Sequence, residues 1–390
     1  MEAMGHTAQG AHAPVEPQPA RWRGRFWAEV KPFVEIGLFV LPALLGPAAI
    51  AAYVVGKYHV TPFKLDGKYF PDGGFLFDLH VMWKAGHDIV TGHSPYPFVY
   101  PAPAAFLMVP FGLLPWKVAV AAFSLFVTGA LFLTLRLLGV RDWRCYGAAC
   151  ASAPFVGTIA VGTLSAFLAL CAALAWRYRD RRWIVAIAIV GAVATKIFLW
   201  PLVVWLVATR RFRSAATTVL LGIATVFGFW GAIGFSGLTG YVHFMRHVAG
   251  LELGRSYSSF AFFSSLGASD GSARLAVVAL TLIGIVAILA IARGADGDRR
   301  SFVAAIAVAL LVSPIVWLHY MILLYVVVAL YRRRLSVAWL IPSLYWILPG
   351  EDSHGSTAVI VRMWLVTGLT VVFALFPSRR RAPQPALASR

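Results

Sequence analysis

Polar residues that could take part in acid–base chemistry stand out in a chain that is otherwise apolar. The segment FLFDLHVMWKAGHDIVTGHSPY (residues 75–96) contains Asp78. A carboxylate beside an apolar wall gains basicity, because desolvation disfavours its charged form. Asp78 could therefore act as a general base that takes the proton from an attacking hydroxyl. This chemistry would suit transfer of a sugar from a lipid-linked donor.

Candidate phosphate ligands follow much later in the chain. Lys196 stands in AVATKIFLWPL, where an unpaired charge is costly, so it either binds phosphate or extends its amine to the interface. Arg255 and Ser258 could offer a charge and a hydroxyl to an anion, or belong to an ordinary solvated loop. His319 could bind phosphate or act as the acid–base partner of Asp78, and the alternative is a histidine paired with a backbone carbonyl.

Two tyrosines in the stretch after residue 92 could contact a substrate. Tyr96 and Tyr100 lie in HSPYPFVYPAPAAFLMVPFGLLPW (residues 93–116), whose prolines prevent a continuous helix and predict a re-entrant or surface-lying segment. These rings either line a sugar or lipid pocket or belong to the aromatic belt of the membrane interface.

An amphipathic helix is expected to carry Asp78. From this residue onward, apolar positions recur at helical spacing and polar ones fall opposite them, which is typical of a helix in the membrane interface. Gly92 should end it. Asp78 could also serve as the N-cap of this helix, a role compatible with that of a base.

The composition places these residues in a membrane protein. Of the 390 residues 60% are hydrophobic and 13% are charged, and the mean hydropathy is +0.76. Apolar runs long enough to cross a bilayer recur along the chain, so we predict an all-α, polytopic helix bundle. The net charge of +18 is divided among short loops, which argues against nucleic-acid binding.

Basic clusters predict the topology. Seven groups of Lys and Arg are expected to face the cytoplasm: residues 21–25, 136–144, 177–183, 210–213, 293–300, 331–335 and 378–381. Paired spans between them give about twelve crossings, with both termini cytoplasmic. Residues 31–377 would form the membrane domain, with an extracytoplasmic catalytic segment at 57–116. Residues 1–30 and 378–390 would be disordered cytoplasmic tails.

Several motifs follow one another in order along residues 75–325. The early motif is Asp78 followed by G-x-x-P-Y at residues 92–96 and Y-P-x-P at residues 100–103. The later motifs are T-K-x-x-x-x-P at residues 195–201 and S-P-x-x-W-x-H-Y at residues 313–320. This ordered set resembles the polyprenol-phosphate-dependent glycosyltransferases of family 87. This sequence differs from the family pattern at two motifs. The usual Y-P-P is Y-P-A-P here, and the usual G-Q-x-N turn is replaced by Gly-Thr-Leu-Ser at residues 162–165.

The resemblance implies a GT-C fold in a multi-pass plasma-membrane enzyme with an extracytoplasmic active site. It implies a polyprenyl-phosphate sugar as donor, most often mannose and in some relatives arabinofuranose, with a lipid or glycan hydroxyl as acceptor. In the family the early aspartate is the expected catalytic base, a role that carries over to Asp78. From the residues themselves we expect His319 to be its partner. We likewise expect Lys196, Arg255 and Ser258 to hold the donor phosphate, and Trp317 and Tyr320 to join the two earlier tyrosines in the substrate pocket.

We expect an inverting reaction that needs no metal or other cofactor. The sequence near Asp78 has no D-x-D pair to hold a divalent ion, and the leaving group carries one phosphate. A transporter or flippase for a lipid-linked sugar is the main rival. Transporters commonly contain internal repeats, and the sequence has no second copy of the D-(x)13-G-x-x-P-Y pattern that begins at Asp78. A noncatalytic subunit of a cell-envelope complex is the third alternative.

Overall fold

In the part of the chain that the structure describes, regular structure is helical apart from one short hairpin. A computed structural model describes residues 18–35, 37, 63–65, 68–70, 76–252, 256–347 and 356–375. The hairpin pairs β1 (Phe63–Leu65) with β2 (Lys68–Phe70) antiparallel, and Phe63 lies opposite Phe70. The predicted helical class is confirmed, although the all-α prediction did not include the hairpin.

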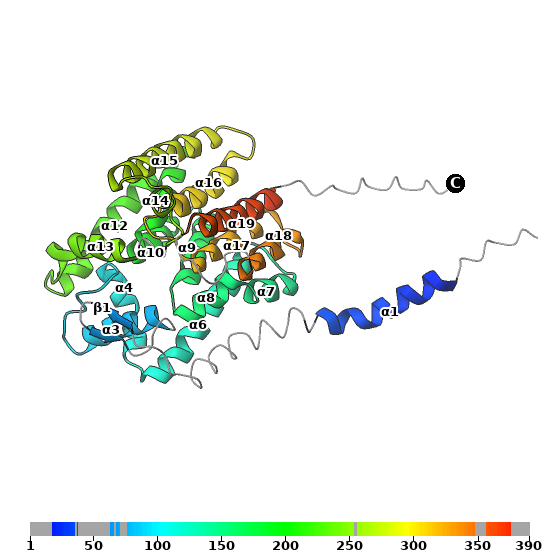
Figure 1. Ribbon diagram of the computed structural model, residues 1–390, viewed down its shortest axis with the longest axis horizontal. Coiled ribbons are helices and arrows are strands. Elements are labelled where there is room, and N and C mark those ends of the chain that lie inside the picture. The colour runs from blue at the N-terminus through cyan, green and yellow to red at the C-terminus, as the bar shows by residue number, and fades with distance from the viewer. Residues whose placement is uncertain are drawn as a thin grey trace, which may run out of the picture.

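The chain combines helices of very different lengths (Figure 1). The first half contains α1 (Gln18–Glu35), α3 (Phe77–Val90), α4 (Ala102–Leu107), α5 (Val109–Gly112), α6 (Trp116–Leu137), α7 (Trp143–Cys150), α8 (Ala153–Val161), α9 (Ser165–Arg177), α10 (Arg182–Thr195) and η2 (Ile197–Leu199). The second half contains α11 (Pro201–Ala208), α12 (Phe212–Ala232), α13 (Leu238–Glu252), α14 (Ser259–Ser265), α15 (Asp270–Ile291), α16 (Gly297–Val312), η4 (Leu318–Leu323), α17 (Leu324–Tyr331), α18 (Val337–Leu340), η5 (Ile341–Trp346) and α19 (Thr357–Leu375).

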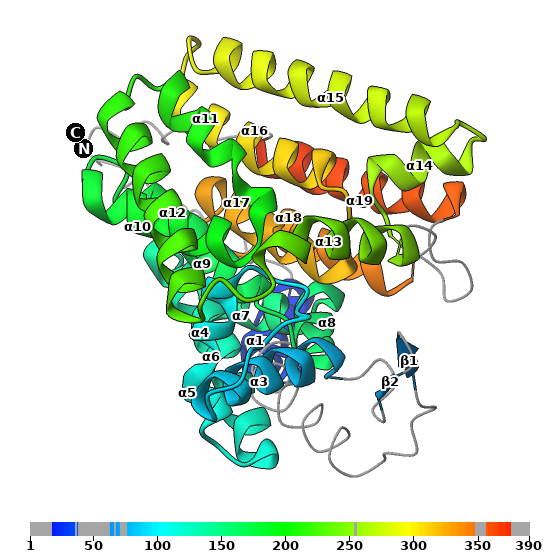
Figure 2. The same cartoon turned by 90° about the vertical axis from the view of Figure 1, so that its left-hand side faces the viewer.

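Four of the described helices, α6, α12, α15 and α19, are long and apolar enough to cross a membrane. Large apolar side chains remain exposed on all four of them, for example Leu125 on α6 (75% exposed), Leu275 on α15 (71%) and Leu365 on α19 (55%). Soluble monomers rarely expose so much apolar surface, so these faces fit contact with lipid. In Figure 2, α15 lies along the edge of the bundle opposite α3. The chain is a membrane protein, and the predicted count of twelve spans stays a prediction.

Three of the basic clusters meet around one carboxylate. Asp298, near the start of α16, accepts bonds from Arg179 at 2.8 Å and from Arg211 at 2.8 Å, and Arg211 also pairs with Asp180 at 2.9 Å. The pKa of Asp298 lies below its usual value, because the two guanidinium groups more than offset the effect of burial. These clusters therefore share one end of the bundle.

Two further basic clusters join the same end. The Asp142 carboxylate accepts the backbone N–H of Leu335 at 3.0 Å, and the Arg299 guanidinium lies 4.3 Å from the centre of the Tyr331 ring. Five of the seven clusters are thus connected by direct contacts, as the topology prediction requires. The cluster at residues 21–25 lies within α1, and that at 378–381 lies outside the described residues.

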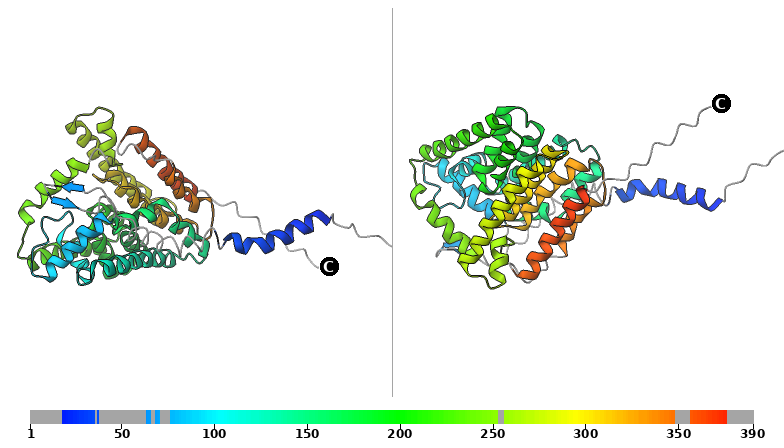
Figure 3. Two further views of the ribbon diagram at one scale, coloured as in Figure 1. Left: turned by 60° about the horizontal axis from the view of Figure 1, so that its bottom comes forward. Right: turned by 90° about the horizontal axis from the view of Figure 1, so that it is seen from above.

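Helix α1 overlaps the segment at residues 1–30 that was predicted to be a disordered tail. It spans Gln18–Glu35 and projects away from the other helices in Figures 1 and 3, while Glu35 pairs with Arg144 at 3.0 Å. A helix at residues 18–30 differs from this expectation, and the division into tails and a membrane domain stays a prediction. The remaining part of the N-terminal tail and the C-terminal tail at 378–390 lie outside the described residues.

Candidate active site

Helix α3 presents Asp78 in its first turn. The helix begins after Leu76, whose left-handed backbone (φ 49°) makes it the N-cap without a side-chain bond. Asp78 is therefore not the N-cap, and the capping alternative is wrong. Its half-buried carboxylate instead accepts a hydrogen bond from the Tyr100 hydroxyl, which lies 2.9 Å from Oδ2.

Close backbone contacts hold α3 in place. A Cβ atom at Gly86 would lie 2.5 Å from the Met108 carbonyl oxygen, and one at Gly112 would lie 2.4 Å from the His87 nitrogen. Only glycine permits such an approach, so α3 rests directly on the backbone of α4 and α5. Trp83 adds a bond from its indole N–H to the Leu114 carbonyl at 3.1 Å. The predicted amphipathic helix thus buries its apolar face on the proline-rich segment.

Lys196 reaches the same place from a break between two helices. Helix α10 ends at Thr195, Lys196 is extended (φ −143°, ψ 113°), and α11 begins at Pro201. The Lys196 side chain is 7% exposed. Its Nζ lies 5.2 Å from the centre of the Tyr100 ring, and no carboxylate of the described residues lies within 4 Å of it. Lys196 is therefore a buried cation one aromatic ring away from Asp78.

Tyr320 closes the other side of this cluster. Lys196 donates a bond to its hydroxyl at 3.2 Å and lies 4.5 Å from its ring centre. Phe198 stacks on Tyr320 with ring centres 4.9 Å apart, and sequence reasoning did not identify it. Its only sequence signal is its position two residues after Lys196. We call Asp78, Tyr100, Lys196 and Tyr320 the polar cluster.

His319 lies beside the polar cluster. Its ring is 4.8 Å from that of Tyr320, in an edge-on arrangement, and its side chain is 5% exposed. The buried Nε2 atom has no hydrogen-bond partner among the described residues. A buried polar atom of this kind normally has a partner, so Nε2 is available to a bound ligand.

Serines near residue 256 connect a distant loop to this region. The Ser256 hydroxyl accepts the N–H of Val316 at 2.9 Å, and Tyr257 donates its N–H to the Val316 carbonyl at 2.9 Å. Ser258 is the N-cap of α14, where its hydroxyl accepts the N–H of Ala261 at 3.2 Å. These contacts hold the segment before His319 in place. The structure gives Ser258 a capping bond, and Arg255 lies outside the described residues.

An aromatic group surrounds Tyr96. Trp230 stacks on it at 5.7 Å, Tyr241 meets its edge at 6.0 Å, and its hydroxyl donates to the Tyr100 carbonyl at 3.4 Å. Trp230 and Tyr241 come from α12 and α13 and carry no motif that could have identified them. Trp317 is half-buried before η4, and the Tyr320 N–H donates to its carbonyl at 3.0 Å.

An apolar groove lies next to the polar cluster. Its volume is about 450 Å³, and its walls include Phe106 from α4, Val190 and Thr195 from α10, and Phe229 from α12. Thr195 directly precedes Lys196 in the chain, so the groove reaches the end of α10 where the lysine follows. Such a groove could take a hydrocarbon chain, because nearly all of its surface is apolar.

The turn at Gly162 packs on α3 at Leu79, the residue that follows Asp78. Gly162 has φ 78°, and a Cβ there would lie 2.4 Å from the Leu79 Cβ. We expect Gly162→Ala to lower the free energy of unfolding by at least about 2 kcal/mol. Alanine disfavours the left-handed backbone conformation, and its Cβ would overlap with the Leu79 side chain. Thermal unfolding in detergent would measure this loss. Gly368→Ala in α19 is the matched control, since nothing lies within 4 Å of its Cβ position. Equal stability of both variants would contradict the expectation.

Comparisons with known proteins agree on one family. The model of glycosyltransferase family 87 matches residues 98–314, which is more than half of the chain. Its range includes Tyr100 and Lys196, and Asp78 and His319 lie outside it. No solved structure matches the chain.

Two curated relatives are each described as a polyprenol-phosphate-mannose-dependent alpha-(1-2)-phosphatidylinositol pentamannoside mannosyltransferase. The one from Mycobacterium tuberculosis (strain CDC 1551 / Oshkosh) is 28% identical over 339 residues, covering 77% of this chain and 73% of the relative. The one from Mycolicibacterium smegmatis (strain ATCC 700084 / mc(2)155) is 25% identical over 316 residues, covering 73% and 72%. Together with the extent of the family match, these relatives establish that the chain is an enzyme and belongs to glycosyltransferase family 87.

Proposed function

We propose that this enzyme transfers mannose from a polyprenyl-phosphate donor to a hydroxyl group of a lipid or glycan acceptor. The observation that carries the proposal is the polar cluster, in which a carboxylate and a buried amine lie on either side of one tyrosine. The mannosyl donor follows from the names of the two relatives. A polyprenyl-phosphate arabinofuranose donor is the alternative within the same family.

Asp78 is the general base in this reaction. The acceptor oxygen attacks the anomeric carbon, the bond from this carbon to the phosphate oxygen breaks, and its electron pair leaves with the polyprenyl phosphate. Asp78 takes the acceptor proton, and the sugar inverts at the anomeric carbon. Burial raises the pKa of Asp78, and the Lys196 charge and the Tyr100 hydrogen bond oppose this rise. A raised pKa makes the carboxylate a better base.

Lys196 stabilises the leaving phosphate. A fixed positive charge in a site that excludes water acts strongly on developing negative charge. The unpartnered Nε2 of His319 can donate a second hydrogen bond to the same phosphate when this nitrogen is protonated. Arg255 and Ser258 remain proposed donor ligands, although the capping bond of Ser258 occupies one lone pair of its hydroxyl. This charge arrangement supports a reaction without a metal ion.

The groove and the aromatic group accommodate the remaining parts of the substrates. The apolar groove beside Thr195 suits the first isoprene units of the donor. Tyr96, Tyr100, Trp317 and Tyr320 form the proposed sugar pocket, since flat rings can stack on the C–H face of a sugar. Trp230 extends this pocket because it stacks on Tyr96.

The proposed topology places the polar cluster on the extracytoplasmic side of a GT-C fold with about twelve spans. Its support is the contact network of the five basic clusters at the opposite end of the bundle, because basic loops favour the cytoplasm. Both termini would then be cytoplasmic.

Transfer of radiolabelled mannose tests the proposal. Purified protein in nanodiscs would receive polyprenyl-phosphate-mannose and membrane lipid acceptors, with and without EDTA. We expect labelled product in both conditions. In sealed liposomes, labelled lipid that crosses the bilayer without sugar transfer would support a flippase instead. Transfer only from polyprenyl-phosphate-arabinose would move the enzyme to the alternative donor.

Tyr100→Phe should change the pH dependence of this transfer. The Tyr100 hydrogen bond lowers the pKa of Asp78, so its loss raises that pKa further. The base works only when deprotonated, and therefore the activity of the variant should fall at a higher pH than that of the wild type. Rate measurements from pH 5 to 9 would reveal the shift. An unchanged acid limb would contradict the role of this hydrogen bond.

A further inference from the structure

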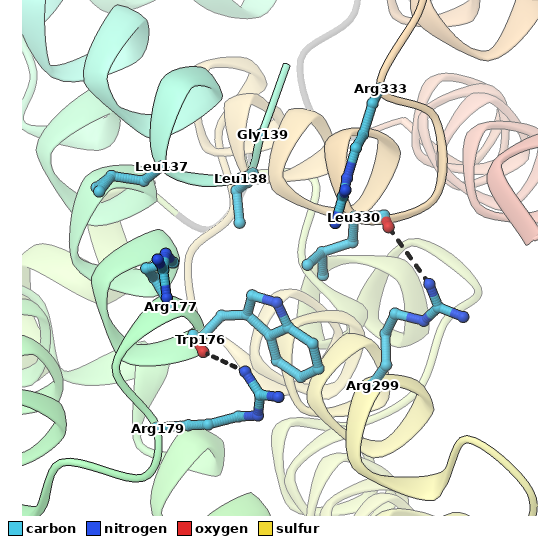
Figure 4. Close-up of a pocket in the computed structure, with 9 residues that line it drawn as sticks. All are labelled: Leu137, Leu138, Gly139, Trp176, Arg177, Arg179, Arg299, Leu330 and Arg333. Atoms are coloured by element: carbon cyan, nitrogen blue, oxygen red, sulfur yellow. Dashed lines mark hydrogen bonds between the residues drawn. The ribbon is translucent and has the colours of Figure 1, made fainter. Parts of the chain in front are cut away.

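A cavity of about 400 Å³ lies at the basic end of the bundle. Four arginines lie around it, namely Arg177, Arg179, Arg299 and Arg333, and Trp176 and three leucines form its apolar wall (Figure 4). Aspartate and glutamate do not occur in this lining. The cavity therefore combines a ring of guanidinium groups with a hydrocarbon surface.

This cavity is separate from the polar cluster. Leu137, at the end of α6, lines it, whereas Trp116 at the other end of α6 contacts Trp83 of the Asp78 helix. A helix of 22 residues is about 33 Å long at 1.5 Å per residue. The distance is close to the thickness of the hydrocarbon core, so the cavity and the polar cluster lie near opposite membrane surfaces.

Two of the four arginines have acidic partners. Arg179 pairs with Asp298 at 2.8 Å, lies over the Trp176 ring at 4.4 Å, and donates to the Trp176 carbonyl at 3.0 Å. Arg299 pairs with Asp296 at 2.6 Å. These contacts fix the two guanidinium groups at the edge of the cavity, because each is held by more than one bond or ring.

The other two arginines keep their charge uncompensated. Among the described residues, neither Arg177 nor Arg333 has a carboxylate within 4 Å. Arg177 lies 5.5 Å from the Tyr178 ring, and Arg333 extends over the turn at Gly139. The cavity thus carries net positive charge, and planar guanidinium groups match phosphate oxygens in pairs.

We propose that this cavity binds the phosphate of an anionic phospholipid headgroup. The apolar wall next to the arginines suits the glycerol and upper acyl carbons, which a free inorganic anion does not have. Basic pockets between spanning helices on the cytoplasmic side recognise such lipids in the same manner. The proposal concerns the end of the bundle opposite the polar cluster and does not depend on the donor or acceptor.

Lipid titration with matched arginine variants tests this site. The full-length protein in neutral detergent would be titrated with phosphatidylglycerol, phosphatidylcholine or inorganic phosphate, and bound lipid counted by native mass spectrometry. The test variant is Arg177→Gln/Arg333→Gln, whose removed charges have no acidic partner. The control is Arg210→Gln/Arg213→Gln, which removes two charges from the same end outside the cavity lining.

We expect phosphatidylglycerol to bind more tightly than phosphatidylcholine, and the test variant to lose at least about tenfold in affinity for it. The control should stay within about twofold of the wild type. Equal losses in both variants, or equal binding of the two lipids, would overturn the proposal. Displacement of the lipid by equimolar inorganic phosphate would assign the cavity to free anions instead. Arg333→Gln alone provides a second variant, since this exposed residue follows the end of α17.

Discussion

Asp78→Asn should reduce sugar transfer by about 10³-fold or more, because a carboxamide cannot take the acceptor proton. The variant keeps the size of the side chain and can still accept the Tyr100 hydrogen bond. Its folding and its binding of the donor should therefore change little. Single-turnover transfer in nanodiscs would measure the loss, and donor binding would be measured on the same sample.

Asp88→Asn is the control on the same helix. Asp88 pairs with Lys84 at 2.7 Å on the outer side of α3, and its removal should leave transfer within about twofold, since exposed ion pairs contribute little. Full activity of Asp78→Asn would remove Asp78 from the mechanism. Equal losses in both variants would indicate disruption of α3 rather than loss of a base.

Lys196→Met should reduce the rate of transfer by about 10²- to 10³-fold, because the leaving phosphate loses its fixed positive charge. Methionine keeps an unbranched apolar chain between the rings of Tyr100 and Tyr320. The same substitution removes the charge that lowers the pKa of Asp78, so the remaining activity should fall at a higher pH. A pH series of initial rates measures both effects together.

Lys117→Met serves as the matched control, since Lys117 is an exposed lysine at the start of α6. We expect it to retain nearly full activity. Lys196→Arg should recover part of the loss, because it restores the charge with a different shape. If Lys196→Met were fully active, the phosphate would need another cation, and Arg255 would be tested next.

The sequence predicted the individual helices and candidate residues of the site better than the contacts between them. The apolar spacing after Asp78 predicted helix α3, and the unusual lysine in an apolar run indicated Lys196 as a candidate phosphate ligand. Both signals are local, since they depend on periodicity and on the cost of a buried charge. The basic clusters likewise predicted which loops lie at the same end of the helix bundle, because basic loops favour the cytoplasmic side of a membrane.

Local patterns could not predict which segments meet. The bond from Tyr100 to Asp78 and the position of Tyr320 beside Lys196 join segments that are 22 and 124 residues apart. Periodicity carries no information on such pairs. Ser258 shows a different limit: a serine before the apolar run SFAF is typical of a helix N-cap, and the same hydroxyl could equally bind an anion.

The glycine contacts beneath α3 have an evolutionary consequence. At Gly86 and Gly112 the backbone of α3 contacts the backbone of α4 and α5 directly. The distance between these helices, and with it the position of Asp78, therefore depends on main-chain contact and hardly on side-chain volume. Substitutions elsewhere on these helices can then accumulate without lifting the carboxylate out of the site. The position of the Asp78 carboxylate is then expected to tolerate changes in the surrounding side chains.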